Sequence, residues 1–256
     1  MKTLLRSAAA AAAIALIAAA CGSGGRAEDP AAAPVTLHVF AAASLQEPFE
    51  ELGEQFESEH EGVSVEFTFT GSSGLVTQIQ EGAPADVFAS ADEANMAKLV
   101  DDGLNGSEPV DFATNTLMIA VPAGNPAGIT DLASLTEDGV DLVVCAPEVP
   151  CGAATETAEE GAGLEFAPVS EEQSVTNVLN KVTTGEADAG LVYVTDVMKA
   201  GEDVEGIEFP EAGSAVNTYP ITTVQSSDQV ELGQTFIDLV TGEEGQSVLA
   251  EYGFQP

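Results

Sequence analysis

Hydrogen-bond donors follow predicted strands at four places in this chain, and each place is also the start of a helical pattern. The first half contributes Ser44 and Ser72, and the second half contributes Cys151 and Tyr193. A helix start offers unpaired backbone N–H groups and the positive end of the helix dipole. Together with hydroxyl groups, such N–H groups can hold an anion without any cation. The pattern predicts a site for an anion.

Each position also has a simpler interpretation when it is taken alone. Ser44 could be a helix N-cap worth about 1 kcal/mol. The segment Thr70–Gly74 could be an ordinary Gly/Ser turn. A purely structural, adhesive lipoprotein would also fit the composition. The donor positions would then fall at strand ends by coincidence, so their agreement favours a binding site.

The charge of the chain limits its partners. It has 43 acidic and six basic residues, for a net charge of −37. Only Arg26, Lys98, Lys181 and Lys199 follow the N-terminal apolar run. Such a surface cannot replace the counterions of nucleic acid, and it favours a soluble monomer. Any bound anion must therefore be held by neutral donors.

Strand and helix patterns alternate along the chain and position these donors. Strands are expected over 35–40, 63–69, 86–89, 115–121, 141–145, 187–193 and 218–224. Helices are expected over 46–59, 75–79, 92–100, 131–135, 153–160, 174–184, 229–240 and 244–252. Alternation of this kind predicts an α/β fold with mostly parallel sheets. Because ligands bind beyond the carboxyl ends of such strands, the four donor positions imply a cleft between two lobes.

The N-terminus resembles an export signal. Lys2 and Arg6 precede an apolar run, Ala8–Ala20, that is too short for a permanent membrane span. Because small residues precede Cys21, the segment resembles a bacterial lipoprotein signal, although plain secretion stays open. We expect a signal peptide over 1–20, a flexible tether over 21–34, and a protein on the outer face of the cell membrane, lipid-anchored through Cys21.

Two further cysteines, Cys145 and Cys151, lie six residues apart. In an exported chain this spacing favours a local disulfide. A metal site is the alternative. It is disfavoured because His38 and His60 are the only histidines and neither lies near the pair in sequence.

Several segments resemble the periplasmic molybdate-binding proteins of ATP-driven importers, which are two-lobe solute-binding proteins of type II. The resemblance covers roughly 35–256. It is carried by Val39–Leu45, Gly82–Phe88, Pro147–Gly152, Gly190–Tyr193 and Tyr252–Phe254. It implies one lobe from 35–115 and 218–256, another from 116–217, hinge crossings near 114–116 and 217–218, and delivery of the ligand to a membrane permease.

The resemblance also implies roles for individual residues. Molybdate or tungstate would be held by hydroxyl and backbone N–H groups of Ser44 and Ser72, by the backbone N–H groups of Cys151 and Val175, and by the Tyr193 hydroxyl. Ser73 could replace or assist Ser72. Cys151 stands where the family commonly has alanine, a change that a backbone donor tolerates. No cofactor is implied.

Other functions fit the sequence less well. A donor-only site suits a dianion such as molybdate, tungstate or sulfate and disfavours monohydrogen phosphate, whose proton needs an acceptor. A sulfate-binding protein is therefore the nearest alternative. A ferric-ion binder would use adjacent tyrosines, but Tyr193, Tyr219 and Tyr252 are scattered in the sequence. Catalysis is disfavoured because no Gly-x-Ser-x-Gly elbow surrounds Ser44.

Overall fold

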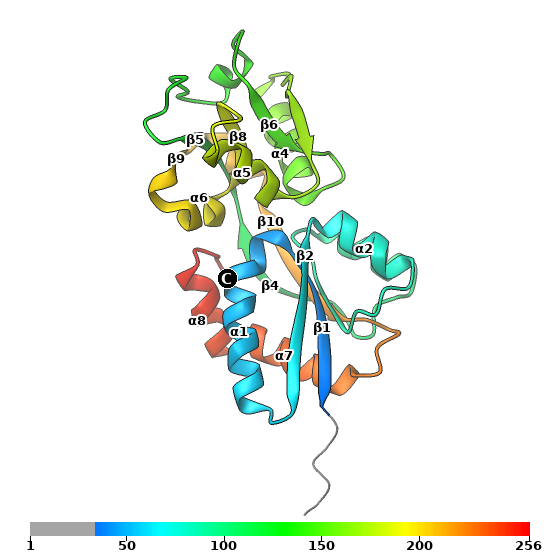
Figure 1. The fold of residues 1–256 in the computed structure, drawn as a ribbon. Helices are drawn as coiled ribbons and strands as arrows, with labels where there is room; N and C mark the ends of the chain where they lie inside the picture. Colours follow the sequence, from blue (N-terminus) through cyan, green and yellow to red (C-terminus); the bar gives the residue numbers. More distant parts are fainter. Residues whose placement is uncertain (1–33) are drawn as a thin grey trace, which may run out of the picture. The chain divides into compact units, whose positions relative to one another are not determined.

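Two five-stranded sheets form the centres of two lobes in the computed structural model (Figure 1). The structure describes residues 34–256, so the predicted signal peptide, Cys21 and the tether up to Ala33 lie outside the described residues. In the first sheet the strand order is β2 (Val63–Thr70), β1 (Val35–Ala42), β3 (Val87–Ala89), β10 (Asn217–Thr223) and β4 (Val110–Asn115). In the second sheet it is β7 (Ser170–Glu172), β6 (Leu142–Cys145), β8 (Ala189–Tyr193), β5 (Leu117–Pro122) and β9 (Val204–Ile207).

Both sheets are mixed, whereas mostly parallel sheets were expected. β1 pairs in parallel with β2 and β3, but β10 runs antiparallel to β3 and β4. Likewise, β6 pairs in parallel with β7 and β8, but β5 runs antiparallel to β8 and β9. The reason is the path of the chain, because β5 and β10 each enter their sheet from the other lobe. They therefore start at the edge where the parallel strands end.

Eight helices flank the two sheets in residues 34–256. The first lobe carries α1 (Gln46–Glu59), α2 (Ser72–Gln80), α3 (Glu93–Asp101), α7 (Val230–Thr241) and α8 (Glu243–Glu251). The second lobe carries α4 (Pro150–Ala162), α5 (Val175–Thr183) and α6 (Val194–Ala200). Short 3-10 turns occupy Ala43–Leu45, Ala133–Thr136, Gly201–Asp203 and Pro210–Ser214. None of the helices in this part of the chain has the length and apolarity needed to cross a bilayer.

Helices cover both faces of the first sheet. On one face, Phe49 and Phe56 of α1 pack against Phe236 of α7, with ring centroids 5.9 and 5.4 Å apart. On the other face, α2 and α3 bury Leu75 and Leu99. Burying each such side chain contributes roughly 1.5–3 kcal/mol. The two helix layers therefore hold the carboxyl ends of β1 and β2 in place. Ser44 and Ser72 come two residues after these strand ends.

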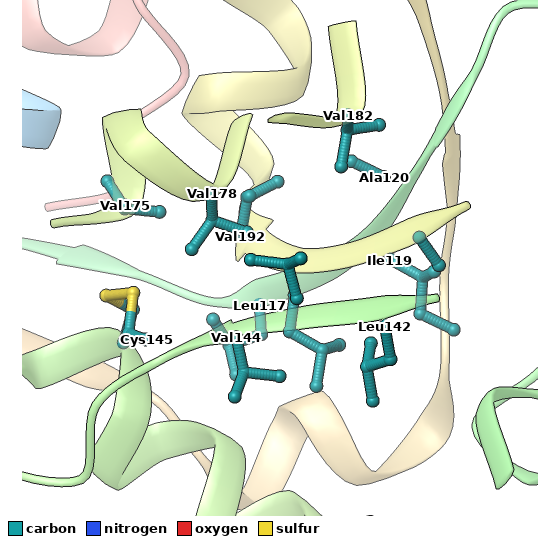
Figure 2. Packing of buried hydrophobic residues seen from close by; sticks show 14 of the residues in the cluster. Leu117, Ile119, Ala120, Leu142, Val144, Cys145, Val175, Val178, Val182 and Val192 are labelled. Atoms are coloured by element: carbon teal, nitrogen blue, oxygen red, sulfur yellow. A yellow bond between two sulfur atoms is a disulfide. The ribbon is translucent and has the colours of Figure 1, made fainter. Parts of the chain in front are cut away.

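The second lobe has one continuous core, with α5 against its sheet (Figure 2). The helix presents Val175, Val178 and Val182 to the strands, at the i, i+3 and i+7 spacing of one helical face. A Cβ on Gly190 of β8 would lie 2.7 Å from Val178, so the glycine permits this close packing. The Cys145–Cys151 disulfide lies at the edge of the same cluster and joins the end of β6 to the start of α4.

Several boundaries differ from the sequence-based expectations. β4, β7 and β9 were not predicted, because they are short, polar or partly exposed and lack clear alternation. α4 begins at Pro150 rather than near Ala153, since proline is well suited to the first position of a helix. Cys151 therefore lies in the first turn of α4, and not in a loop before it.

Candidate anion-binding site

A small pocket lies where the two lobes meet. The first lobe lines it with Ala42, Ala43, Ser44, Gly71, Ser72 and Ala91, and the second with Val149, Pro150, Cys151, Val175 and Tyr193. The lining includes all five residues for which the sequence analysis expects a role in anion binding, Ser44, Ser72, Cys151, Val175 and Tyr193. Ser73 is buried but does not line the pocket. The space that a water-sized sphere can reach in it is only about 10 Å³, far below the roughly 300–1,000 Å³ of sites for drug-sized ligands.

A larger, open depression of about 570 Å³ lies at the opposite end of β1. It is lined by Val35, Val63 and the start of α7. None of the residues expected to bind an anion lines it. The inter-lobe pocket is therefore the candidate site.

Helix N-termini supply the positive potential of this pocket. α2 begins at Ser72, α4 at Pro150 and α5 at Val175, and all three residues line the pocket. Neither Gly71 nor Val149, the N-cap residues of α2 and α4, caps its helix with a side chain. The first N–H groups of α2 and α4 thus remain available to a ligand. By contrast, α5 is capped by Ser174, whose hydroxyl accepts the N–H of Asn177, and α3 by Asp92, whose carboxylate accepts the N–H of Asn95.

The two serine hydroxyls each have one neighbouring partner inside the protein. The backbone N–H of Ala91 donates to Ser72 Oγ over 2.9 Å, so the single proton of Ser72 remains for another acceptor. Ser44 Oγ lies 3.0 Å from the hydroxyl of Tyr219, and either oxygen can be the donor. When Tyr219 donates, Ser44 also has its proton free for an anion.

Tyr193 brings a third hydroxyl to the pocket. The side chain is 1% exposed, and its hydroxyl has no hydrogen-bond partner within residues 34–256. An unpaired buried hydroxyl costs about 1–3 kcal/mol, so the group is placed for a partner that arrives with the ligand. Burial raises the pKa of Tyr193 well above its usual value, which keeps the hydroxyl protonated and able to donate.

The backbone around Tyr193 is held by a buried carboxyl group. Asp196, in the first turn of α6, accepts the Tyr193 N–H over 2.9 Å. Burial raises the pKa of Asp196 to about 7, an effect that the nearby Lys199 partly offsets. Asp196 itself does not line the pocket.

Cations and carboxylates are both missing from the lining of this pocket. The described residues contain 41 acidic residues and three lysines, because two of the acids and three of the bases precede Pro34. Lys181 pairs with Glu172, Lys199 with Glu47, and Lys98 donates to Asn95. The site therefore offers neutral donors and helix ends, as the composition required.

The histidines and tyrosines do not assemble another kind of site. His38 lies 3.6 Å from Glu66, and His60 stacks on Phe56, so neither is a partner of Ser44. Within residues 34–256 no three His, Cys, Asp or Glu residues are grouped as metal ligands.

The expectation that the tyrosines are scattered needs correction. Tyr193 and Tyr219 are neighbours, with ring centroids 6.2 Å apart. Folding brings β8 and β10 together, which their separation in sequence could not show. The Tyr219 hydroxyl is bonded to Ser44, and no carboxylate lines the pocket beside the pair, so the arrangement still differs from a ferric-ion site.

Sequence reasoning missed three residues that shape the site. Tyr219 supports Ser44, Ala91 supports Ser72, and Gly71 lines the pocket. Gly71 carried a detectable signal, because it directly precedes the helix that starts at Ser72. Tyr219 and Ala91 carried none, since their contacts join segments far apart in the chain.

Comparison with known proteins identifies the family of this chain. Residues 37–255 match the family model of the bacterial extracellular solute-binding proteins. The chain belongs to this family. The molybdate-binding protein ModA of Mycobacterium tuberculosis is 48% identical over 238 residues, covering 92% of this chain and 91% of that protein. ModA of Escherichia coli is 32% identical, covering 85% of this chain and 88% of its own length.

A solved structure shows the same two-lobe fold. The periplasmic molybdate-binding protein of Azotobacter vinelandii superposes with a TM-score of 0.73 at 21% identity, covering 86% of this chain and 99% of that protein. At this identity the likeness concerns the fold. The members of this family are solute-binding proteins.

Proposed function

We propose that this protein captures molybdate, and also tungstate, in the inter-lobe pocket and delivers it to the membrane permease of an ATP-driven importer. The observation that carries the proposal is a small pocket whose lining has no cation and no carboxylate, at three helix N-termini and beside three hydroxyls. The proposed contacts are the hydroxyl and N–H groups of Ser44 and Ser72, the N–H groups of Cys151 and Val175, and the Tyr193 hydroxyl.

The donor set explains both affinity and selectivity. Hydrogen bonds to a charged partner contribute about 1.5–3 kcal/mol each, so several in one closed pocket give tight binding without a cation. Monohydrogen phosphate would bring a proton that finds no carboxylate on the pocket wall to accept it, which disfavours it. Sulfate meets the same donors and remains the second candidate, separated from molybdate by its smaller size.

The proposal includes closure of two lobes about a hinge. We assign 35–115 and 218–256 to one lobe and 116–217 to the other. Support comes from Thr116, the single residue between β4 and β5, and from Asn217, where β10 begins. A ligand that contacts both lobes favours the closed state. Small-angle scattering should therefore show a smaller radius of gyration with molybdate, and an unchanged radius would oppose this assignment.

We also propose that the mature protein is a monomer anchored to the outer face of the cell membrane through a lipid on Cys21. The proposal rests on the small residues before Cys21 and on the family, whose members are extracellular. Replacing Cys21 by serine should release the protein from membranes. Continued membrane retention of Cys21→Ser would rule out this anchor.

Isothermal titration tests the ligand. The protein without its signal peptide is titrated with molybdate, tungstate, sulfate and phosphate in turn. Tight binding of the first two, with weak sulfate and phosphate binding, is the expected result. Tight sulfate binding would keep the mechanism but change the ligand, whereas no binding of any oxyanion would overturn the proposal.

Ser44→Ala tests the site itself. The variant loses a donor hydroxyl and should bind molybdate more weakly by about 1–3 kcal/mol. Ser58→Ala is the matched control, because Ser58 lies on the exposed part of α1 and bonds only to the Gln55 carbonyl. Equal affinity of Ser44→Ala and the control would remove Ser44 from the site.

A further inference from the structure

At the rim of the pocket, the first lobe touches two backbone carbonyl groups of the second lobe. Gly71 lies against the carbonyl of Gln173, and the side chain of Asn95 donates to the carbonyl of Glu148 over 3.3 Å. Glu148 directly precedes the segment 149–151, and Gln173 lies two residues before Val175. The two contacts therefore fall beside the backbone segments through which the second lobe lines the pocket.

Gly71 makes its contact because it has no side chain. A Cβ at this position would lie 2.2 Å from the Gln173 oxygen and 3.1 Å from Val149 Cγ1. The backbone of Gly71, with φ −62° and ψ 141°, is one that any residue adopts. Glycine is thus required because the opposite lobe leaves no room for a side chain. The local backbone conformation does not require it.

Asn95 is oriented by its own lobe before it reaches across the pocket rim. It is 1% exposed, and its amide nitrogen also donates to Asp92 over 2.9 Å. Lys98 donates to the Asn95 side-chain oxygen over 2.8 Å. With both ends of the amide held, the group is presented to Glu148 with little rotational freedom.

The two carbonyl groups belong to one braced part of the second lobe. The Ala146 N–H donates to the Glu172 carbonyl over 2.9 Å, which joins the loop before α4 to the strand before α5. The Cys145–Cys151 disulfide closes the same loop. A displacement of either carbonyl group is therefore passed to the N–H groups of α4 and α5.

We propose that Gly71 and Asn95 are positioning residues that set how far the lobes close and so align the donors of the second lobe on the bound anion. The inference rests on the proposed function for the nature of the ligand. Gly71 sets the distance of closest approach, and Asn95 holds the closed state once it forms. A Cβ at residue 71 would have to push the Gln173 carbonyl away by about 1.2 Å, from 2.2 to 3.4 Å, to reach an ordinary separation.

The test uses the whole mature protein and three variants. Gly71→Ala blocks the close approach, and Asn95→Ala removes the cross-lobe bond without changing a residue that lines the pocket. Gly74→Ala is the matched control, because its Cβ would lie 3.6 Å from Thr70, which is ordinary contact. Molybdate dissociation is followed by stopped flow, and the distance between spin labels on the two lobes is measured at saturating ligand. Thermal unfolding checks that each variant is folded.

We expect Gly71→Ala to release molybdate at least tenfold faster and to remain measurably more open at saturation. Asn95→Ala should release it severalfold faster, and Gly74→Ala should match the wild type. Wild-type rates in both Gly71→Ala and Asn95→Ala would overturn the proposal. A fast-releasing Gly71→Ala that closes fully would also overturn it, since the new methyl group would then act only inside the pocket.

A failure of the proposed function gives a different result. In that case the wild type binds none of the four oxyanions, whatever the variants do. The inter-lobe distance is then compared in the unliganded proteins, where Gly71→Ala should shift it to larger values. Identical distance distributions in the wild type and Gly71→Ala would overturn the closure role.

Discussion

At the scale of single residues, the site depends on which way each hydroxyl proton points. Ser72 already accepts a backbone N–H, so its proton is left for the ligand. Tyr193 has no partner among the described residues and can donate freely. Ser44 is the variable member, because its bond to Tyr219 can run in either direction. An anion bound as proposed would favour the direction in which Tyr219 donates to Ser44 and Ser44 donates its own hydrogen bond to the ligand.

Tyr219→Phe tests the role of the hydrogen bond between Tyr219 and Ser44. The variant keeps the packing of the ring against Phe254 and Phe112 but removes the donor to Ser44. Molybdate affinity measured by titration should fall by about 0.5–1.5 kcal/mol, the net value of one hydrogen bond. Tyr252→Phe is the control, since the Tyr252 hydroxyl bonds to Glu51 away from the pocket lining. A Tyr219→Phe variant with unchanged affinity would show that Ser44 needs no orienting partner.

At the scale of elements, the pocket is built from three helix starts, and two of them have no side-chain cap. α2 and α4 have no side-chain cap at their N-termini. The missing cap lowers the stability of each helix by about 1 kcal/mol. The bound anion can take the place of the missing caps. No residue of α3 lines the pocket, although Ala91, just before its N-cap, does. This helix has the usual aspartate cap, Asp92.

The disulfide at the start of α4 makes a prediction about stability. Replacing both Cys145 and Cys151 by alanine opens a loop of about seven residues and should lower the free energy of unfolding by about 2 kcal/mol. The N–H of residue 151 is retained, so molybdate affinity should fall less than stability does. Chemical denaturation and titration of the same variant measure the two effects. An unfolding free energy equal to that of the wild type would contradict the prediction.

Asp196, in the first turn of α6, makes the stability of the protein depend on pH. Its pKa is about 7 in the folded protein and near 4 when the chain is unfolded, so the folded state favours the protonated carboxyl group. The contribution of Asp196 is thus fully present below about pH 4 and is lost as the pH rises through 7.

Asp196→Asn should remove this dependence, because the amide stays neutral and its oxygen still accepts the Tyr193 N–H. The stability of the variant relative to wild type should increase between about pH 4 and 7 and level off above that range. Denaturant unfolding across the pH range measures the difference. A difference that does not change with pH would contradict the prediction. Asp141→Asn is a control at an exposed carboxylate.

At the scale of the whole molecule, an anion-binding protein carries a large negative charge. With 41 acids and three lysines, residues 34–256 have a net charge of −38 and repel a dianion at long range. The attraction of the helix ends acts only over the first turn. The net charge of the protein therefore slows the approach of the dianion, whereas the helix ends stabilise it once it is bound.

This contrast predicts an unusual response to salt. The Debye length falls from about 30 Å at 0.01 M to about 3 Å at 1 M, which screens the long-range repulsion more than the contacts in the pocket. The association rate of molybdate in stopped flow should rise with ionic strength, while its dissociation rate changes little. An association rate that falls with salt would mean that a local positive field steers the ligand.

Much of the site was visible in the sequence because its chemistry is local. A strand, a small turn and a helix start define an open N–H group within about ten residues, and this pattern nominated Ser44, Ser72, Cys151 and Tyr193. Val175 was nominated by family resemblance at a predicted helix start. The α/β class and most helices were predicted for the same reason, since hydrophobic periodicity is a short-range property.

Tertiary structure decided everything that joins distant segments. Packing placed Ser72 rather than Ser73 on the pocket wall, because successive residues of a helix point in different directions. It set β5 and β10 antiparallel to their neighbours, brought Tyr219 to Ser44, and placed Gly71 and Asn95 against the opposite lobe. These contacts join residues from 53 to 175 positions apart. No local pattern encodes such pairs, because their geometry exists only once both lobes have folded and closed.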